Sequence, residues 1–324
     1  MVTLLSAKYV SSLLRLNLSE MTRELEAARD IPESSPARKK PRTTVEPAPT
    51  RSLDSLQSTG LFQRRGYVVI PSFLTAEELA FLRDESTQLF AALDENAAVA
   101  TQKLVDSGCV LDTMADCPMQ EASPARVDKH AYLEARAHQV GRLGGALATT
   151  YERAQTHDLL LFERLPRLTQ QLLDIGPAEP VYFFNEHYVV KPPQSNVEFR
   201  WHRDDDEQLA MCVHRDTIPP YVSAWCALDD VTLENGPLQF VPLDTGTSLS
   251  LDPKIQELRD LASEPLVVTA GTAVMFLSNV WHFSSSNRSA ATRRAFYAQY
   301  SATPITATPR KEAAPLSFAV PCRF

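Results

Sequence analysis

The sequence predicts a protein of the α+β class, in which helices buttress a β-barrel or a β-sandwich. Two patterns support this prediction. From about residue 94 to residue 180, apolar side chains recur mostly at helical spacing. After Pro180 the chain continues as at least six short runs rich in β-branched and aromatic residues, separated by turn residues. These runs are VYFFNEHYVVK, NVEFRWH, YVSAWCAL, LQFVPL, PLVVTAGTAVMFL and RRAFYAQYS.

The chain of 324 residues divides into an N-terminal segment and one domain. Residues 1–52 contain a proline-rich, charged tract that buries too little apolar surface to offset its ordering entropy, so we predict disorder or a targeting role there. Within this segment the basic cluster PARKKPR favours a nuclear signal, whereas the Ser/Leu-rich start favours a mitochondrial presequence. Nuclear, cytoplasmic and mitochondrial locations therefore all stay open.

Residues 53–324 form the predicted domain. It begins with the strand-like run GYVVIPSF, and Thr75 with Glu78 forms a capping box that predicts the start of a helix over TAEELAFLRDESTQLFAAL. The helical region 94–180 is expected near the entrance of the active site.

The composition argues against several classes of function. Only 10 glycines are present, and neither the dinucleotide-binding pattern G-x-G-x-x-G nor the phosphate-binding pattern G-x-x-x-x-G-K-[ST] occurs. The net charge of −8 argues against nucleic-acid binding, and no apolar run reaches the roughly 18 residues of a membrane span. The five cysteines include no C-x-x-C pair, which is typical of an intracellular protein in a reducing compartment.

Histidines and a carboxylate at strand ends predict a metal site. His202 and Asp204 end a strand-like run with one residue between them, so both side chains lie on one face and can bind one ion. His282 ends another such run and can add a third ligand. Two histidines and one carboxylate leave the opposite metal positions open, as in non-haem Fe(II) oxygenases. A second H-x-D, His214 with Asp216, precedes two prolines that a central strand would not tolerate, and we rank it second.

One of two adjacent arginines is expected to bind a carboxylate. Arg293 and Arg294 open the run TRRAFYAQY, and strand alternation places only one of them inside. A buried arginine at a strand start can hold a carboxylate through two parallel hydrogen bonds. The alternation by itself does not choose between the two.

Four strings resemble the phytanoyl-CoA dioxygenase family of Fe(II)/2-oxoglutarate oxygenases. They are WHRDDDEQ, VSAWCALDDVTLENGPLQFVP, WHFSSSNRS and TRRAFYAQY, and GYVVIPSFLTAEELAFL is similar to the N-terminal strand and helix of the same family. The resemblance covers about residues 53–301. It implies a double-stranded β-helix, which is the jelly-roll or cupin-like fold, with Fe(II) and 2-oxoglutarate as cofactors and with O₂ and a small organic molecule as substrates.

The resemblance also implies roles for individual residues. His202, Asp204 and His282 become the iron ligands, and Arg293, eleven residues after His282, becomes the partner of the far carboxylate of 2-oxoglutarate. Four further residues match positions close to the cosubstrate or substrate: Trp225, Ser284, Asn185 and Lys191.

The chain departs from the family pattern at three places. The string ENGPLQFVPLDTG lacks the Gly and His that usually follow in the family, which argues against the substrate that gives the family its name. Phe283 stands where the family prefers glycine and is expected to narrow the pocket. Asp206 and Glu207 extend the acidic run after Asp204, either as a solvated turn or as an attraction for a cationic group of the substrate.

We therefore expect a dioxygenase that hydroxylates a small organic substrate and releases succinate and CO₂. Because Asp204 stands where a halogenating enzyme would have Gly or Ala, no ligand position is left for a halide. Two alternatives remain: a metal-binding cupin-like enzyme that does not use 2-oxoglutarate, and a non-catalytic binding protein that retains the fold.

Overall fold

The computed structural model describes residues 56–95, 110–111, 128–142, 156–206, 219–247, 249, 253–305 and 319–324. The predicted N-terminal segment 1–52 lies outside these residues, and so do Glu207, His214 and Asp216. The predictions for these residues therefore stay predictions. None of the described helices has the length and apolarity that crossing a bilayer requires.

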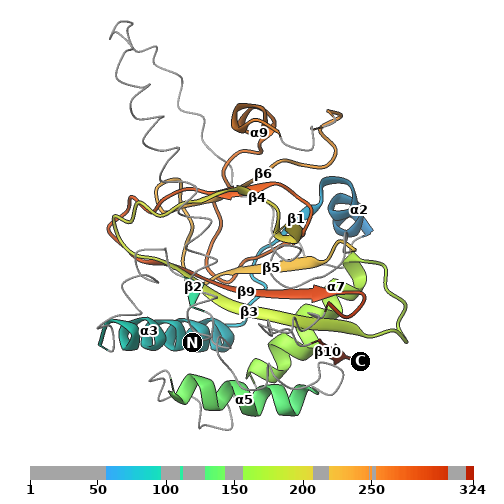
Figure 1. Cartoon of the computed structure of the whole chain (residues 1–324), viewed down its shortest axis with the longest axis vertical. Helices are drawn as coiled ribbons and strands as arrows, with labels where there is room; N and C mark the ends of the chain where they lie inside the picture. The colour runs from blue at the N-terminus through green and yellow to red at the C-terminus, as the bar shows by residue number, and fades with distance from the viewer. Residues whose placement is uncertain are drawn as a thin grey trace, which may run out of the picture. The chain divides into compact units, whose positions relative to one another are not determined.

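Two antiparallel sheets form the centre of the domain (Figure 1). The main sheet has the strand order β1-β7-β5-β9-β3-β10, and β2 also pairs with β3. The smaller sheet has the order β4-β8-β6. The strands are β1 (Tyr67–Ile70), β2 (Val110–Leu111), β3 (Val181–Lys191), β4 (Phe199–His202), β5 (Val222–Ala227), β6 (Leu238–Phe240), β7 (Ala273–Leu277), β8 (His282–Ser284), β9 (Arg293–Ser301) and β10 (Val320–Cys322).

Helices cover one face of the main sheet, and Figure 1 shows α3 and α5 on the side of β3 and β9 away from β4 and β6. The predicted capping box opens α3: the Thr75 amide donates to Glu78 at 2.8 Å and the Glu78 amide to the Thr75 hydroxyl at 3.1 Å. The α+β class is therefore confirmed. The described helices are α2 (Leu56–Arg65), α3 (Ala76–Glu95), α5 (Lys129–Arg142), the π-helical η4 (Leu160–Arg164), α7 (Leu165–Leu172) and α9 (Ile255–Leu261).

The main sheet has an apolar core on each face. One core includes Phe183 and Phe296 and packs against the helices, whereas the other includes Trp225 and Tyr297 and continues to Phe240 of the smaller sheet. We call these the helix side and the barrel side. The described helices of the region 94–180 contribute to the helix side; the role expected for this region at the site entrance stays a prediction.

A β-bulge in β3 changes which residues face each side. Val181 and Phe183 belong to the helix-side core, and the register against β9 then shifts between Phe183 and Asn185. Beyond the bulge, Tyr188 lies on the helix side, while Asn185 and Lys191 bond to barrel-side residues. The alternation of β3 is therefore different before and after the bulge.

The helix side buries a group of charges that we call the ion cluster: Glu85 of α3, Arg136 of α5 and Glu186 of β3. Arg136 donates to Glu85 at 2.6 Å and to Glu186 at 2.5 Å. The hydroxyl of Tyr132 donates to Glu186 at 2.5 Å, and the hydroxyl of Tyr188 donates to Glu85 at 2.6 Å. All five side chains are buried, so the cluster links both helices to the sheet.

The charges of the ion cluster shift each other's pKa. Burial alone would raise the pKa of Glu186, but Arg136 and then His157, whose Nε2 lies 3.5 Å from Glu186, lower it to about 2. The pKa of Glu85 is lowered too, because Arg136 outweighs the effect of burial. Both carboxylates are therefore ionised at neutral pH.

Candidate metal centre

The two sheets bring the three predicted metal ligands together. His202 at the end of β4 pairs in register with His282 at the start of β8, and Asp204 follows β4 by two residues. One donor atom from each of the three residues lies within 4.8 Å of the others. Oδ1 of Asp204 lies 3.5 Å from Nε2 of His282 and 3.8 Å from Nε2 of His202. These atoms can therefore face a single ion.

Both histidines present the nitrogen that a metal needs. Nδ1 of His202 donates to the carbonyl oxygen of Arg200 at 2.6 Å, and Nδ1 of His282 donates to that of Val280 at 3.0 Å. A proton on Nδ1 leaves the lone pair on Nε2 for a metal. Burial, followed by the neighbouring His202, lowers the pKa of His282 to about 4, so its imidazole is neutral at pH 7.

The aspartate of the triad is held by residues that the sequence did not reveal. Ser223 on β5 and Tyr297 and Gln299 on β9 all donate to Oδ2 of Asp204. Burial alone would raise the pKa of Asp204, but His282, His202 and these hydroxyls lower it. The sequence did contain one indication that Tyr297 and Gln299 belong to the site: by strand alternation, both share a face of β9 with Arg293.

A pair of buried cations lies beside the triad, and we call Lys191 and Arg293 the cation pair. They face each other across β3 and β9, and both side chains are fully buried. Lys191 donates to the Ser284 hydroxyl at 2.7 Å, and Arg293 donates to the same hydroxyl at 3.1 Å. Arg293 also lies over the ring of Trp225, 5.2 Å from its centroid. A carboxylate at this place would meet two positive charges and one hydroxyl.

Gly236 of the ENG string shapes this site, although no sequence pattern had singled it out. Its carbonyl oxygen accepts a hydrogen bond from Arg293, and its φ of +91° is in the region that favours glycine. A Cβ at this position would lie 2.5 Å from the carbonyl oxygen of Ser285 and 3.1 Å from Cδ of Lys191. Only glycine therefore fits between these residues.

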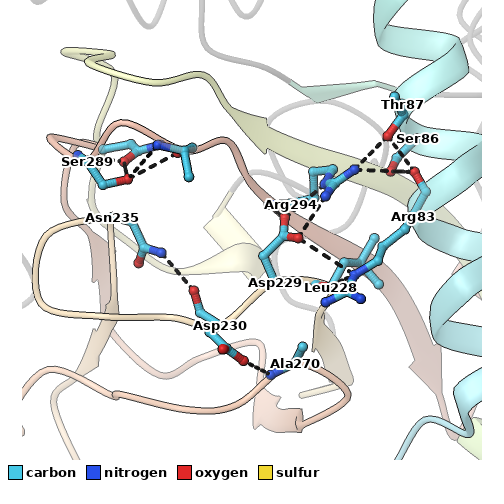
Figure 2. Close-up of polar contacts among 12 residues, drawn as sticks. Arg83, Ser86, Thr87, Leu228, Asp229, Asp230, Asn235, Ala270, Ser289 and Arg294 are labelled. Carbon is cyan, nitrogen blue, oxygen red and sulfur yellow. Dashed lines mark hydrogen bonds and ion pairs between the residues drawn. The ribbon is translucent and has the colours of Figure 1, made fainter.

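Arg294, the residue after Arg293, points to the opposite side of β9. Figure 2 shows Arg294 directed toward Asp229 and toward α3, where it donates to Asp229 at 2.7 Å and to Thr87 at 2.6 Å. In the same view the carbonyl of Asp230 accepts a bond from Asn235 at 2.7 Å, which braces the loop before Gly236. Strand alternation thus places Arg293 inside, as the family resemblance implies.

Asn185 and Lys191 both lie on the barrel side of β3, but they contact different groups. The amide nitrogen of Asn185 donates to the side-chain oxygen of Gln299 at 2.9 Å. Asn185 is therefore linked to Asp204 through Gln299, whereas Lys191 belongs to the cation pair.

The acidic run after Asp204 is partly balanced within the chain. Arg203 donates to both carboxylate oxygens of the exposed Asp206, at 2.7 and 2.9 Å. Glu207, which was expected to act together with Asp206, lies outside the described residues. The ion pair with Arg203 reduces the field that Asp206 could offer to a cationic substrate.

Phe283 does not narrow the site. Consecutive residues of a strand face opposite sides, so Phe283 points away from the side that His282 faces. Its ring stacks on Trp201, with 5.5 Å between the centroids. The expected effect of this departure from the family pattern was therefore wrong.

The fold and the site agree with a comparison to protein families. Residues 62–295, more than half of the chain, match the model of the family Phytanoyl-CoA dioxygenase (PhyH). The chain belongs to the phytanoyl-CoA dioxygenase family. Two imidazoles and a carboxylate on one face are the ligands of non-haem Fe(II) oxygenases, so the donor set of this family member fits Fe(II).

Two relatives of the phytanoyl-CoA dioxygenase family are similar along most of their length. The chain is 24% identical over 268 residues to Phytanoyl-CoA dioxygenase domain-containing protein 1 of Danio rerio, covering 74% of this chain and 87% of that protein. It is 22% identical over 262 residues to the protein of the same name from Mus musculus, covering 72% and 86%.

Two solved structures have a similar fold. EctD from S. alaskensis, crystallised with 2-oxoglutarate and 5-hydroxyectoine, has a TM-score of 0.52 at 22% identity, covering 77% of this chain and 78% of that chain. AviO1 from Streptomyces viridochromogenes Tue57 has a TM-score of 0.51 at 22% identity, covering 82% of this chain and all of the other. The predicted cupin-like core buttressed by helices is therefore confirmed.

Proposed function

We propose that this protein is an Fe(II)- and 2-oxoglutarate-dependent dioxygenase that hydroxylates a small organic substrate. His202, Asp204 and His282 would hold the metal, and Arg293, Lys191 and Ser284 would hold the far carboxylate of the cosubstrate. When bound, Fe(II) and 2-oxoglutarate supply the oxidative chemistry: O₂ is reduced, 2-oxoglutarate is decarboxylated to succinate and CO₂, and one oxygen atom enters the substrate.

One observation carries this proposal: the cation pair converges on a residue of the strand that also carries a metal ligand. Ser284 follows His282 by two residues on β8, so about 7 Å separates their positions along the strand. A five-carbon dicarboxylate spans a comparable distance. It can therefore reach from the triad to the cation pair in one extended molecule. EctD, whose fold is similar, was crystallised with 2-oxoglutarate, which supports the same choice of cosubstrate.

The side chains around the cation pair favour a dry, fixed carboxylate site. Lys191, Arg293 and Ser284 are all buried, and Trp225 covers the guanidinium from one side. Charge-assisted hydrogen bonds are strongest where water is excluded. The hydroxyl of Ser284 lies between both cations and would complete the set of donors.

An anaerobic titration tests the proposal. The purified protein is loaded with Fe(II), and 2-oxoglutarate is added while the visible charge-transfer absorption of the chelate is followed. We expect saturable absorption in the wild type and none in His202→Ala. Exposure to O₂ should then release succinate. Absence of the absorption in the wild type, or an unchanged band in His202→Ala, would contradict the proposal.

Neighbouring arginines provide a matched pair of variants for the cosubstrate site. Arg293→Met should weaken 2-oxoglutarate binding at least about 30-fold, because a buried charge-assisted pair contributes about 2 kcal/mol or more. Arg294→Met makes the same chemical change one residue later, on the helix side, and should leave the affinity unchanged. If Arg293→Met binds 2-oxoglutarate like the wild type, Arg293 does not hold the far carboxylate. If Arg293→Met is active without 2-oxoglutarate, the protein is a metal-binding enzyme of another kind.

A further inference from the structure

The two carboxylate oxygens of Asp204 have different surroundings. Oδ1 faces the two histidines, at 3.5 Å from Nε2 of His282 and 3.8 Å from Nε2 of His202. Oδ2 points the other way and accepts hydrogen bonds from Ser223 at 2.5 Å, from Gln299 at 3.4 Å and from Tyr297. Asp204 itself comes from the segment after β4, so these bonds join that segment to the main sheet.

The three donors are fixed by their own packing. Ser223 lies opposite Gln299 in the register of β5 and β9. The ring of Tyr297 stacks on His187, with 4.6 Å between the centroids, and also contacts Phe276. The hydroxyl of Tyr297 therefore cannot leave Asp204 without moving two neighbouring rings.

Asn185 fixes the orientation of Gln299. Its side-chain nitrogen donates to the oxygen of the Gln299 amide at 2.9 Å, so the nitrogen of that amide is directed to the opposite side, toward Asp204 and Ser223. A chain of hydrogen bonds thus runs from Asn185 through Gln299 to Oδ2. We call Ser223, Tyr297 and Gln299 the carboxylate cradle.

We propose that Tyr297, together with the rest of the carboxylate cradle, is a positioning residue that makes Asp204 bind the metal through Oδ1 alone. A carboxylate oxygen that already accepts two short hydrogen bonds has no lone pair left for a metal. The proposal rests on the proposed function, because it takes the triad as the metal site.

The carboxylate cradle would limit how many donor atoms the protein gives to the metal. His202, His282 and Oδ1 of Asp204 would supply three, which would leave the remaining positions for the cosubstrate and O₂. A second bond from Oδ2 would take one of those positions. By holding Oδ2 away from the metal, the cradle would leave them accessible.

Cobalt(II) in place of iron tests this without turnover. Binding is followed by the ligand-field absorption of Co(II), whose intensity and position depend on the coordination number. Tyr297→Phe removes one hydroxyl and keeps the ring on His187. We expect it to weaken Co(II) binding about 10- to 100-fold, as for other residues that orient metal ligands, and to change the absorption spectrum.

Tyr300→Phe is the matched control. Tyr300 lies on the same strand, is also buried and donates its hydroxyl to the carbonyl of Leu161 at 2.9 Å on the helix side. It should leave both the Co(II) affinity and the spectrum unchanged. Wild-type affinity and an unaltered spectrum in folded Tyr297→Phe would overturn the proposal.

A second variant and a triad variant complete the experiment. Ser223→Ala removes another donor to Oδ2, again by the loss of one hydroxyl. It should also weaken Co(II) binding and alter the spectrum, and it tests the proposal even if Tyr297→Phe does not fold. His202→Ala separates the two proposals. If it abolishes Co(II) binding while both cradle variants bind normally, only the role of the cradle is wrong. If it has no effect, the metal site itself is wrong.

Discussion

On the helix side of the main sheet, Arg136 lies between Glu85 and Glu186, and the buried charges pair with one another. On the barrel side, the same sheet buries Lys191 and Arg293 side by side, where the hydroxyl and carbonyl groups of Ser284 and Gly236 accept their hydrogen bonds. The ion cluster joins opposite charges, whereas the cation pair joins like charges.

This difference indicates different uses of buried charge. A cluster that joins opposite charges needs no ligand and ties helices α3 and α5 to the sheet, so its removal should appear in the free energy of unfolding. Two like charges held close together repel, and an anionic ligand relieves the repulsion. Removal of a member of the cation pair should therefore appear mainly in ligand affinity.

The largest effect on stability is expected from Arg136→Met. This change leaves two buried carboxylates without their shared cation, which should lower the free energy of unfolding by about 3–5 kcal/mol. The measurement is urea denaturation at pH 7. Arg293→Met serves as the comparison on the barrel side. It leaves no carboxylate behind, so we expect a loss of roughly 1 kcal/mol. Equal losses in the two variants would show that the two sides use buried charge alike.

The second-largest loss of stability is expected at acid pH, where the ion cluster on the helix side should weaken. The pKa of Glu186 is about 2 in the folded state, below its value of about 4.3 in an unfolded chain. Its ionised form therefore stabilises the fold above about pH 4.3, and this contribution of roughly 3 kcal/mol is lost as the pH falls toward 2. Glu85 acts in the same direction. Denaturation midpoints measured across this range should fall steeply in the wild type and less steeply in Glu186→Gln. Parallel profiles would assign the acid sensitivity elsewhere.

The smallest effect is expected from Arg294→Gln. Its ion pair with Asp229 is partly exposed, with 21% of the arginine side chain and 18% of the aspartate side chain accessible. Such a pair contributes about 0.5–1 kcal/mol, and salt screens it. Denaturation in low and high salt should show a small loss that shrinks as salt is added. A loss comparable to that of Arg136→Met would place Arg294 among the buried charges that hold the fold together.

The sequence predicted the parts of the site that depend on short spacing. The H-x-D motif placed His202 and Asp204 on one face, and alternation required one of Arg293 and Arg294 to point inward. It could not reveal contacts that depend on how distant segments pack. Ser223 and Tyr297 reach Asp204 from other strands, and their residue types are common in any strand.

The structure also differs from what we expected for Asp206 and Phe283, and neighbouring residues explain both differences. Asp206 was considered by its charge alone, although Arg203, three residues earlier, can reach it within one helical turn. Phe283 was considered by its size, although its neighbour His282 already pointed inward and alternation required Phe283 to point outward. The ion cluster could not be predicted, because Arg136 and Glu186 are 50 residues apart and meet only when α5 docks.

The bulge in β3 inserts one extra residue and so changes which residues of the strand face each side. Before it, Val181 and Phe183 point to the helices; after it, Tyr188 does, and Asn185 and Lys191 point to the barrel. If β3 kept all its residues but alternated regularly from Val181, Lys191 would face the helices and Glu186 would face the three predicted metal ligands. Deleting one residue at the bulge would instead straighten the strand and leave Lys191 and Glu186 on their present sides. One extra residue in β3 thus decides which charges are buried on each side of the main sheet.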